Sequence, residues 1–206
     1  MKRLYLLRHG QTEFNVKKLV QGRCDSPLTD LGRQQARAAA AWLKAHSVVP
    51  DKVVSSPLGR AMDTASLVAC ELLGPDAAAE PCEGIIERCY GSFEEGPHGA
   101  LPTDVWDPGE DLVPFGGEGS RALQERMVGA LTNLMGSEGI ETLLAVSHGS
   151  ASRQFIKAAA PEGFELPTKL PNCAIMIFGF DDAREEDDTP QCKFTLQQIV
   201  DPQQSH

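Results

Sequence analysis

The sequence lacks a hydrophobic run long enough to cross a membrane, and the apolar stretch near its start is too short for a signal peptide. It also lacks a Cys-x-x-Cys pair, which argues against a zinc ribbon and a thioredoxin-like motif. We therefore expect a cytoplasmic protein whose cysteines are mostly small buried hydrophobic residues. The six cysteines are Cys24, Cys70, Cys82, Cys89, Cys173 and Cys192.

Positive charge is scarce as well. The formal net charge is −10, from 19 Lys and Arg against 29 Asp and Glu. This balance argues against nucleic acid or an anionic membrane as a partner. It gives no overall attraction for a phosphate, so a phosphate site would have to be built from local cations. The 206 residues, 41% of them hydrophobic, suffice for one domain with its own core, which we place at 1–206.

The most informative stretch is an apolar run, 4–7, that ends in Arg8, His9 and Gly10. The run predicts a buried strand, and ligands of open α/β sheets bind at the carboxyl ends of strands. Arg8 offers a planar fork for phosphate, and a neutral His9 can attack an electrophile. Gly10 allows a sharp turn close to a ligand, and Thr12 can start a helix. A strand that simply ends in polar residues at a turn explains this stretch equally well.

A second stretch repeats that pattern. Residues 142–146 form the clearest predicted buried strand, and His148 and Gly149 follow it before a predicted helix at 150–159. A single histidine in this position would be interpreted as structural. The repetition of strand, histidine, glycine and helix favours a functional role for His148.

Two more charged residues lie just after predicted strands. Arg60 is in the first turn of a helix that follows the strand 52–54, where a cation opposes the helix dipole. Glu87 follows 85–86, which we expect to end a third short strand. Taken singly, each is explained as a surface residue. Together with the two histidines they would converge at one sheet edge, where cations can hold a phosphoryl group and a carboxylate can move protons.

The polar loop between the first strand and the first long helix holds Asn15 and Gln21. Both side chains could donate to an anion. Hydrogen bonding within the loop explains them as well, and for Gln21 we weigh the two explanations equally.

Strand and helix patterns alternate along the chain. We expect helices at 28–45, 58–73, 119–135 and 150–159, and two late strands at 173–180 and 193–199 joined by the acidic segment 181–189. This order predicts an α/β fold, a three-layer α/β/α sandwich with a mostly parallel sheet and an antiparallel edge strand.

Residues 92–118 break the alternation, being rich in Gly, Pro, Asp and Glu with Phe93, Trp106 and Phe115 interspersed. Loops of this length are usually functional lids or disordered, and we interpret this one as an excursion over the site, with a solvated insertion nearly as well supported. Three histidines without supporting neighbours are treated as surface residues: His46, His98 and His206.

Five stretches spread over most of the chain occur in a recognisable order. They are Leu7-Arg8-His9-Gly10-Gln11-Thr12 with Asn15, Leu28-Thr29-Asp30-Leu31-Gly32 with Gln35-Ala36, Ser55-Ser56-Pro57-Leu58-Gly59-Arg60-Ala61 with Thr64-Ala65, Glu87-Arg88-Cys89-Tyr90-Gly91-Ser92-Phe93-Glu94-Glu95-Gly96, and Val146-Ser147-His148-Gly149. In this order they resemble the motifs of the histidine phosphatase superfamily, which includes the cofactor-dependent phosphoglycerate mutases. The resemblance implies a phosphoglycerate mutase-like fold.

The resemblance also implies roles for individual residues. His9 would be the nucleophile that becomes a phosphohistidine, while Arg8, Arg60 and His148 would hold the phosphoryl oxygens. Asn15, Gln21 and the backbone at Gly22 would line the substrate pocket. Glu87 would protonate the leaving oxygen and then activate water. The glycine after His148, where the acid-phosphatase branch usually has aspartate, points to Glu87 as the acid.

One departure bears on the reaction. Residues 89–120 contain no Lys or Arg, whereas the glycolytic mutases use basic residues after the acid block to hold a second acidic group. Arg88, which directly precedes this segment and adjoins Glu87, is interpreted as facing solvent. We expect the acidic residues of this segment to disfavour a second phosphate, and Trp106 or Phe115 to cover an apolar part of the substrate.

We therefore expect a phosphomonoester hydrolase acting on a small phosphorylated metabolite, needing no metal and no cofactor. A cofactor-dependent phosphoglycerate mutase is the alternative, and a non-catalytic phospho-ligand binding protein ranks low because His9 and Glu87 are both present. A zinc hydrolase is also disfavoured, since no two ligands have short metal-site spacing. The expected partner is a small phosphate ester, with neither nucleic acid nor membrane. The substrate and the oligomeric state stay open, with a homodimer as one candidate.

Overall fold

The computed structural model describes residues 1–182 and 192–204. Its helices and strands are β1 (Lys2–Arg8), α1 (Glu13–Lys17), α2 (Asp30–Ala45), β2 (Lys52–Ser55), α3 (Gly59–Leu73), β3 (Glu80–Pro81), α4 (Ser120–Met135), β4 (Thr142–Ser147), α5 (Gly149–Ala159), β5 (Ile175–Phe180) and β6 (Phe194–Val200). Four single 3-10 turns lie at Glu83–Ile85, Gly91–Phe93, His98–Ala100 and Val113–Phe115.

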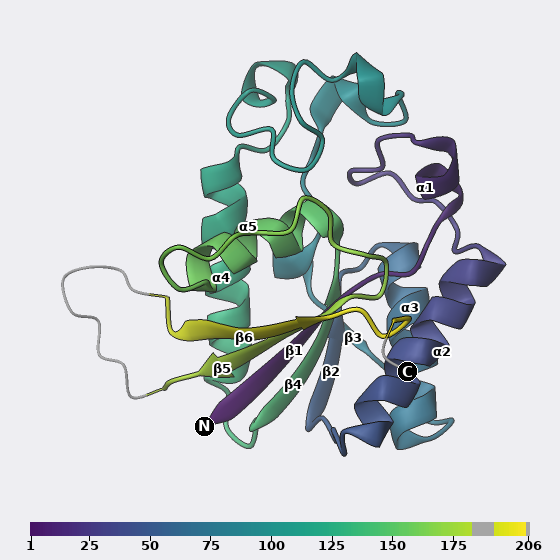
Figure 1. The fold of residues 1–206 in the computed structure, drawn as a ribbon, viewed down its shortest axis with the longest axis vertical. Coiled ribbons are helices and arrows are strands. Elements are labelled where there is room, and N and C mark those ends of the chain that lie inside the picture. Colours follow the sequence, from purple (N-terminus) through teal and green to yellow (C-terminus); the bar gives the residue numbers. More distant parts are fainter. Residues whose placement is uncertain (183–191, 205–206) are drawn as a thin grey trace.

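Six strands form one sheet in the order β3-β2-β4-β1-β5-β6, so β1 lies in the interior (Figure 1). β1, β2, β3 and β4 pair in parallel, while β5 is antiparallel to both β1 and β6. The predicted mostly parallel sheet with antiparallel pairing at one edge is confirmed. The segment 181–189, which we expected to join the last two strands, lies mostly outside the described residues.

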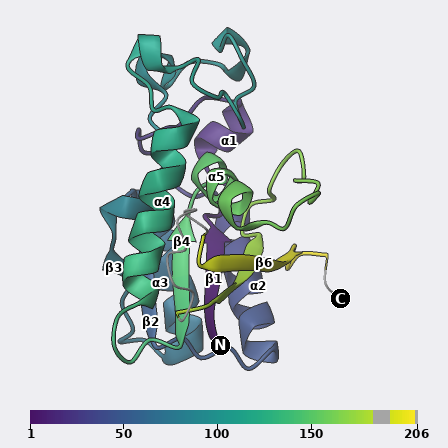
Figure 2. The ribbon, with the colours of Figure 1, turned by 90° about the vertical axis from the view of Figure 1, so that its left-hand side faces the viewer.

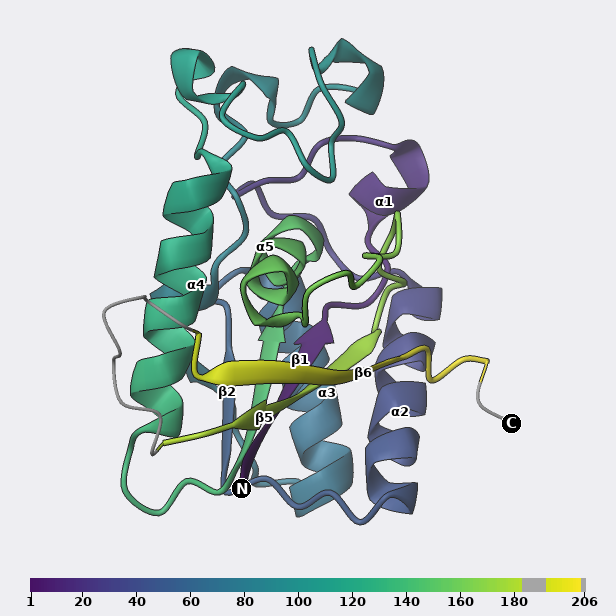
Figure 3. The same cartoon turned by 60° about the vertical axis from the view of Figure 1, so that its left-hand side comes forward.

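Two hydrophobic layers enclose the sheet because side chains alternate along each strand. In β1, Leu4 and Leu6 pack with α4 and α5, whereas Tyr5 and Leu7 pack with α2 and α3. Figures 2 and 3 show the two helix pairs on opposite faces of the sheet. The predicted three-layer α/β/α sandwich is therefore confirmed. It leaves the carboxyl ends of the parallel strands at one edge, next to the excursion 92–118 (Figure 1).

The prediction of a strand ending at residues 85–86 is wrong. The third strand is only Glu80–Pro81, and Ile85 closes a 3-10 turn instead. Pro81 offers no N–H to a neighbouring strand, and Ile85 reaches the core beside α4 through the turn. The apolar pair was therefore a sign of burial and not of extended backbone.

The expectation for the cysteines is also wrong. Only Cys173 is buried; Cys70 is exposed, and the other four are partly exposed. Two of them, Cys24 and Cys89, lie in loops around the strand ends and not in the core. In residues 1–182 and 192–204, no helix combines the length and the apolar character needed to span a bilayer.

Candidate active site

Hydrogen bonds between neighbouring strand ends bring the two predicted histidines together. The backbone N–H of His9 donates to the carbonyl of Ser147 at the end of β4, over 3.0 Å, and that of Ser56 donates to Val146, over 2.9 Å. β1, β2 and β4 therefore end side by side. The ring centroids of His9 and His148 are 5.2 Å apart.

The hydrogen bond made by His9 decides which ring nitrogen is free. Its Nδ1 lies 2.7 Å from the carbonyl oxygen of Gly10, and because a carbonyl only accepts, Nδ1 carries the proton. The lone pair of neutral His9 is then on Nε2. Burial, followed by the charges of Arg60 and Arg8, holds the pKa of His9 well below its ordinary 6.5. His9 is therefore an uncharged imidazole at neutral pH, the form a nucleophile requires.

His148 is held through its opposite nitrogen. Its Nε2 is 2.7 Å from the hydroxyl of Ser56, and its Nδ1 is buried without a hydrogen-bond partner. Burial, then the charges of Arg60, His9 and Arg8, keep the pKa of His148 well below 6.5. His148 does not line the pocket itself. It is a neutral group with one nitrogen still able to bond.

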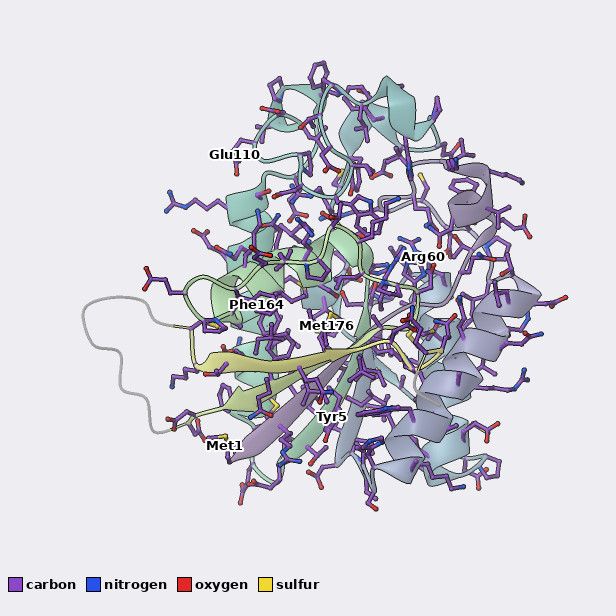
Figure 4. The ribbon with its side chains drawn as sticks, viewed as in Figure 1. Met1, Tyr5, Arg60, Glu110, Phe164 and Met176 are labelled. Atoms are coloured by element: carbon purple, nitrogen blue, oxygen red, sulfur yellow. The ribbon has the colours of Figure 1, made fainter. Side chains whose placement is uncertain are left out.

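Two buried arginines supply the positive charge. Arg60, in the first turn of α3, donates from both terminal nitrogens to the carbonyls of Gly22 and Cys24, each over 2.7 Å. Arg8 donates to the carbonyl of Leu170, and burial lowers the pKa of Arg8 to about 10, so it remains a cation at neutral pH. The Nε of each arginine is buried and has no partner. Arg60 is labelled in Figure 4 at the end of the sheet that faces the excursion.

Glu87 is anchored at the N-terminus of α5. Its carboxylate accepts hydrogen bonds from the backbone N–H groups of Arg88, Ser150 and Ala151, at 2.8, 3.3 and 2.9 Å. The positive end of the helix favours a carboxylate in this position. Glu87 is buried and lines the same pocket as His9.

The pocket has a volume of about 60 Å³. This suits a group of phosphate size better than a whole drug-sized ligand, which needs ~300 Å³ or more. Seven of the eight predicted site residues line it, all except His148: Arg8, His9, Asn15, Gln21, Gly22, Arg60 and Glu87. We call Arg8, His9, Arg60, Glu87 and His148 the floor.

Asn15 and Gln21 line the pocket and also hydrogen-bond within the loop, so the loop explanation is confirmed and donation to an anion stays a prediction. Thr12 caps α1, which is only five residues long, in a capping box with Asn15. The Thr12 hydroxyl donates to Gln21 over 2.8 Å, and Asn172 donates to Asn15 over 3.2 Å. The loop is thereby fixed against the strand ends.

Gly10 allows close contact with another part of the backbone, and not the close contact with a ligand that we expected. A Cβ at Gly10 would lie 2.4 Å from the carbonyl oxygen of Gly32, and a Cβ at Gly32 would lie 2.1 Å from that of Gln11. The two glycines therefore let β1 and the first turn of α2 touch. Close packing of backbones, and not of backbone on ligand, explains them.

The opposite side of the pocket was largely missed from the sequence. We call it the roof: Leu19, Val20, Tyr90, His98, Val105 and Trp106. Trp106 lies over Arg8, with the guanidinium carbon 5.0 Å from the ring centroid. The expected role of Phe115 is not seen, since it packs edge-on against Phe93 and is 46% exposed. His98 is not a free surface residue, and burial lowers its pKa below 6.5.

The acidic residues of the excursion do not line the pocket, contrary to our expectation. Each of four is engaged elsewhere: Glu94 by the loop at Arg23, Asp107 by Lys157, Glu110 by the backbone of Arg121, and Glu118 by Arg126. Figure 4 shows Glu110 on the outer side of the excursion. What distinguishes the roof is its lack of charge, among the residues described.

Arg88 does not face solvent, so that expectation is wrong. It is fully buried and donates to the hydroxyls of Ser150 and Ser120 and to the carbonyl of Glu118. The two ends of the excursion and the start of α5 are thus tied to one guanidinium. Its position next to Glu87 was the sequence signal that could have revealed this.

Within 1–182 and 192–204, no three His, Cys, Asp or Glu side chains are grouped so that they could hold a metal ion. The expectation of a metal-independent reaction stays a prediction.

Residues 4–189 match the model of the histidine phosphatase superfamily, branch 1, and the chain belongs to this family. The family and the phosphoglycerate mutase-like fold expected from the five stretches are both confirmed.

Characterised and named relatives divide between two activities. The chain is 32% identical over 182 residues to a probable phosphoglycerate mutase, GpmB, of Cronobacter sakazakii, covering 85% of this chain and 83% of that one. It is 32% identical over 158 residues to a broad-specificity phosphatase of Saccharomyces cerevisiae, covering 75% and 69%. A phosphoserine phosphatase of Entamoeba histolytica, solved with phosphoserine, superposes with a TM-score of 0.74 at 27% identity over 98% of each chain.

Proposed function

We propose that this enzyme is a phosphomonoester hydrolase that acts on a small phosphorylated metabolite through a phosphohistidine at His9. The observation that carries the proposal is the tautomer of His9, whose Nε2 lone pair is free in a pocket lined by two buried arginines. The arginines Arg8 and Arg60 each keep a buried Nε without a partner, which a phosphoryl oxygen can fill.

The reaction has two displacements. The cycle begins with Glu87 protonated. In the first step, Nε2 of His9 forms a bond to phosphorus while the bond from phosphorus to the ester oxygen breaks, and Glu87 gives its proton to the leaving oxygen and becomes a carboxylate. In the second, Glu87 takes a proton from water, whose oxygen attacks phosphorus and releases His9 and inorganic phosphate. Fixed positive charge stabilises the transferring oxygens in both steps, and splitting the displacement lowers each barrier.

The roof supports hydrolysis over mutase action. A mutase must hold its intermediate by a second acidic group while that intermediate reorients, and this calls for cations facing the substrate. The roof residues described above are uncharged. Lys18 and Lys169 are near enough to help lower the pKa of His98 but do not line the pocket. The substrate that we propose therefore carries a single phosphate group.

A panel of phosphomonoesters tests the proposal, with phosphoserine, sugar phosphates, 3-phosphoglycerate and nucleotides assayed for phosphate release. A mutase assay with and without 2,3-bisphosphoglycerate runs alongside. We expect hydrolysis of monophosphates and no stimulation by the bisphosphate. Interconversion of 2- and 3-phosphoglycerate that is stimulated by the bisphosphate and faster than hydrolysis would replace this proposal with the mutase. Binding without turnover would favour the non-catalytic alternative.

A further inference from the structure

The orientation of Arg60 depends on a loop and not on its own helix. Both terminal nitrogens of its guanidinium are used by the carbonyls of Gly22 and Cys24, and only Nε is left without a partner. Whatever moves these two carbonyls therefore turns the guanidinium. Arg60 is almost fully buried, so water cannot replace the loop as an acceptor.

One carboxylate holds this loop. Oε1 of Glu94 accepts the backbone N–H of Arg23 over 3.1 Å, and Oε2 accepts the thiol of Cys24 over 3.2 Å. The carboxylate lies so close to the chain that a Cβ at Gly22, where φ is +53°, would be 2.1 Å from Oε1. The peptide groups on either side of Arg23 thus lie against Glu94.

The same carboxylate is tied to the segment that bears the catalytic acid. Oε1 of Glu94 also accepts the backbone N–H of Tyr90 over 2.9 Å, three residues after Glu87. Glu94 therefore joins the beginning of the excursion to the loop that orients Arg60. Burial lowers the pKa of Arg60, and the negative charges of Glu87, Asp25 and Glu94 oppose that shift. Burial with Glu94 nearby raises the pKa of Cys24 to about 12, which keeps the thiol protonated as a donor.

We propose that Glu94 is a positioning residue, which sets the phosphate-binding guanidinium of Arg60 through the Gly22–Cys24 loop without touching the substrate. Glu94 does not line the pocket, and its two oxygens are occupied by the loop and by Tyr90. The inference rests on the proposed function in one respect, which is that Arg60 binds the phosphoryl group.

A double-mutant cycle tests this coupling. The variants are Glu94→Ala, Arg60→Gln and both together, with Asp111→Ala as the matched control because Asp111 is an exposed acid of the same excursion. Orthovanadate affinity is measured for each, together with kcat and KM for p-nitrophenyl phosphate. We expect Glu94→Ala to weaken vanadate binding and lower kcat/KM by about tenfold to 100-fold, the usual loss for a displaced catalytic group. Asp111→Ala should stay within twofold.

The decisive result is the cycle. If Glu94 acts through Arg60, adding Glu94→Ala to Arg60→Gln causes little further loss, whereas additive losses would overturn the inference. Should Glu94→Ala fail to fold, Glu94→Gln keeps one acceptor oxygen and enters the same cycle, with a smaller loss expected. If the wild-type protein hydrolyses the ester and Glu94→Ala shows no loss, the positioning role is refuted while the proposed function stands. Absence of any loss in Arg60→Gln would instead count against the proposed phosphate site.

Discussion

The floor and the roof of the pocket are built by different means. Four floor residues lie at the end of a strand or the start of a helix, and Glu87 follows a 3-10 turn. Backbone groups fix three of their side chains: His9 by a carbonyl, Glu87 by three N–H groups, Arg60 by two carbonyls. The roof consists of loop residues that pack on one another, with Val20 and Tyr90 in a small buried cluster with Leu112. We therefore expect the floor to determine the chemistry and the roof to select the esters that reach it.

The largest effect should come from removing the nucleophile of the floor. We expect His9→Ala to lower phosphate release by at least about 10⁴-fold, because the covalent route is lost. It should also abolish acid-labile, base-stable labelling of the protein by a phosphate donor. Label on another residue, or turnover at the wild-type rate, would disprove the phosphohistidine mechanism.

The second histidine of the floor should matter less. We expect His148→Ala to lower kcat/KM by about 10²- to 10³-fold, the loss typical of one donor to a developing charge. Ser56→Ala, which frees Nε2 of His148, should cost roughly two- to tenfold. Steady-state kinetics with one substrate measures both. Equal losses in the two variants would mean that Ser56 acts in its own right.

The floor should also limit stability in acid. His9 and His148 have pKa values well below 6.5 when folded, so the unfolded chain binds more protons as the pH falls below 6.5. Their contribution is complete above pH 6.5 and is lost as the pH falls toward the folded pKa values, at most about 1.4 kcal/mol per pH unit for each histidine. Urea unfolding at pH 7.5, 6.5 and 5.5 measures this slope. His148→Asn should reduce it, and an unchanged slope would contradict the assignment.

A cation placed in the roof should test whether the roof selects substrates by charge. His98→Lys adds a positive charge to an uncharged surface of the pocket. We expect kcat/KM for 3-phosphoglycerate to rise up to about fivefold relative to that for p-nitrophenyl phosphate, as one solvent-exposed ion pair allows. The ratio of the two substrates within each variant is the measurement, and an unchanged ratio would show that the roof does not select by charge.

The smallest expected effect is that of chelation. Because the cations of the floor are Arg8 and Arg60, activity should survive exhaustive treatment with EDTA and with 1,10-phenanthroline. Phosphate release before and after treatment measures it. A loss that zinc or magnesium restores would contradict the prediction.

The floor could largely be predicted from the sequence, whereas the roof largely could not. His9, His148 and Arg60 could be found because a strand that ends in a charge or an imidazole has a local signature, and parallel strands end at one edge. The roof has no hydrophobic period that a sequence pattern could reveal, so the place of His98, and the choice of Trp106 over Phe115, emerged only from the fold. Arg88 was misplaced because burial of a cation depends on distant acceptors such as the carbonyl of Glu118.

Charge alone was a poor guide to the excursion. Its carboxylates were expected to face the substrate, yet Glu94 and Glu118 accept hydrogen bonds from the chain itself. A long-range partner of that kind leaves no pattern near the residue. The wrong prediction of a strand ending at Ile85 also arose from a long-range contact. Ile85 is apolar because it packs beside α4, and not because it pairs in the sheet.

The interior position of β1 governs when the enzyme can become active during its synthesis. Arg3 in β1 pairs with Thr142 and with Gly179, so an early-made strand finds its neighbours only after most of the chain has left the ribosome. Until then the apolar run at Leu4–Leu7 stays unpaired on the nascent chain, where it is open to aggregation or to a chaperone. A fragment that stops before β4 has no His148 and lacks the strand on which the end of β1 is held, so activity should appear only after β4 has been synthesised.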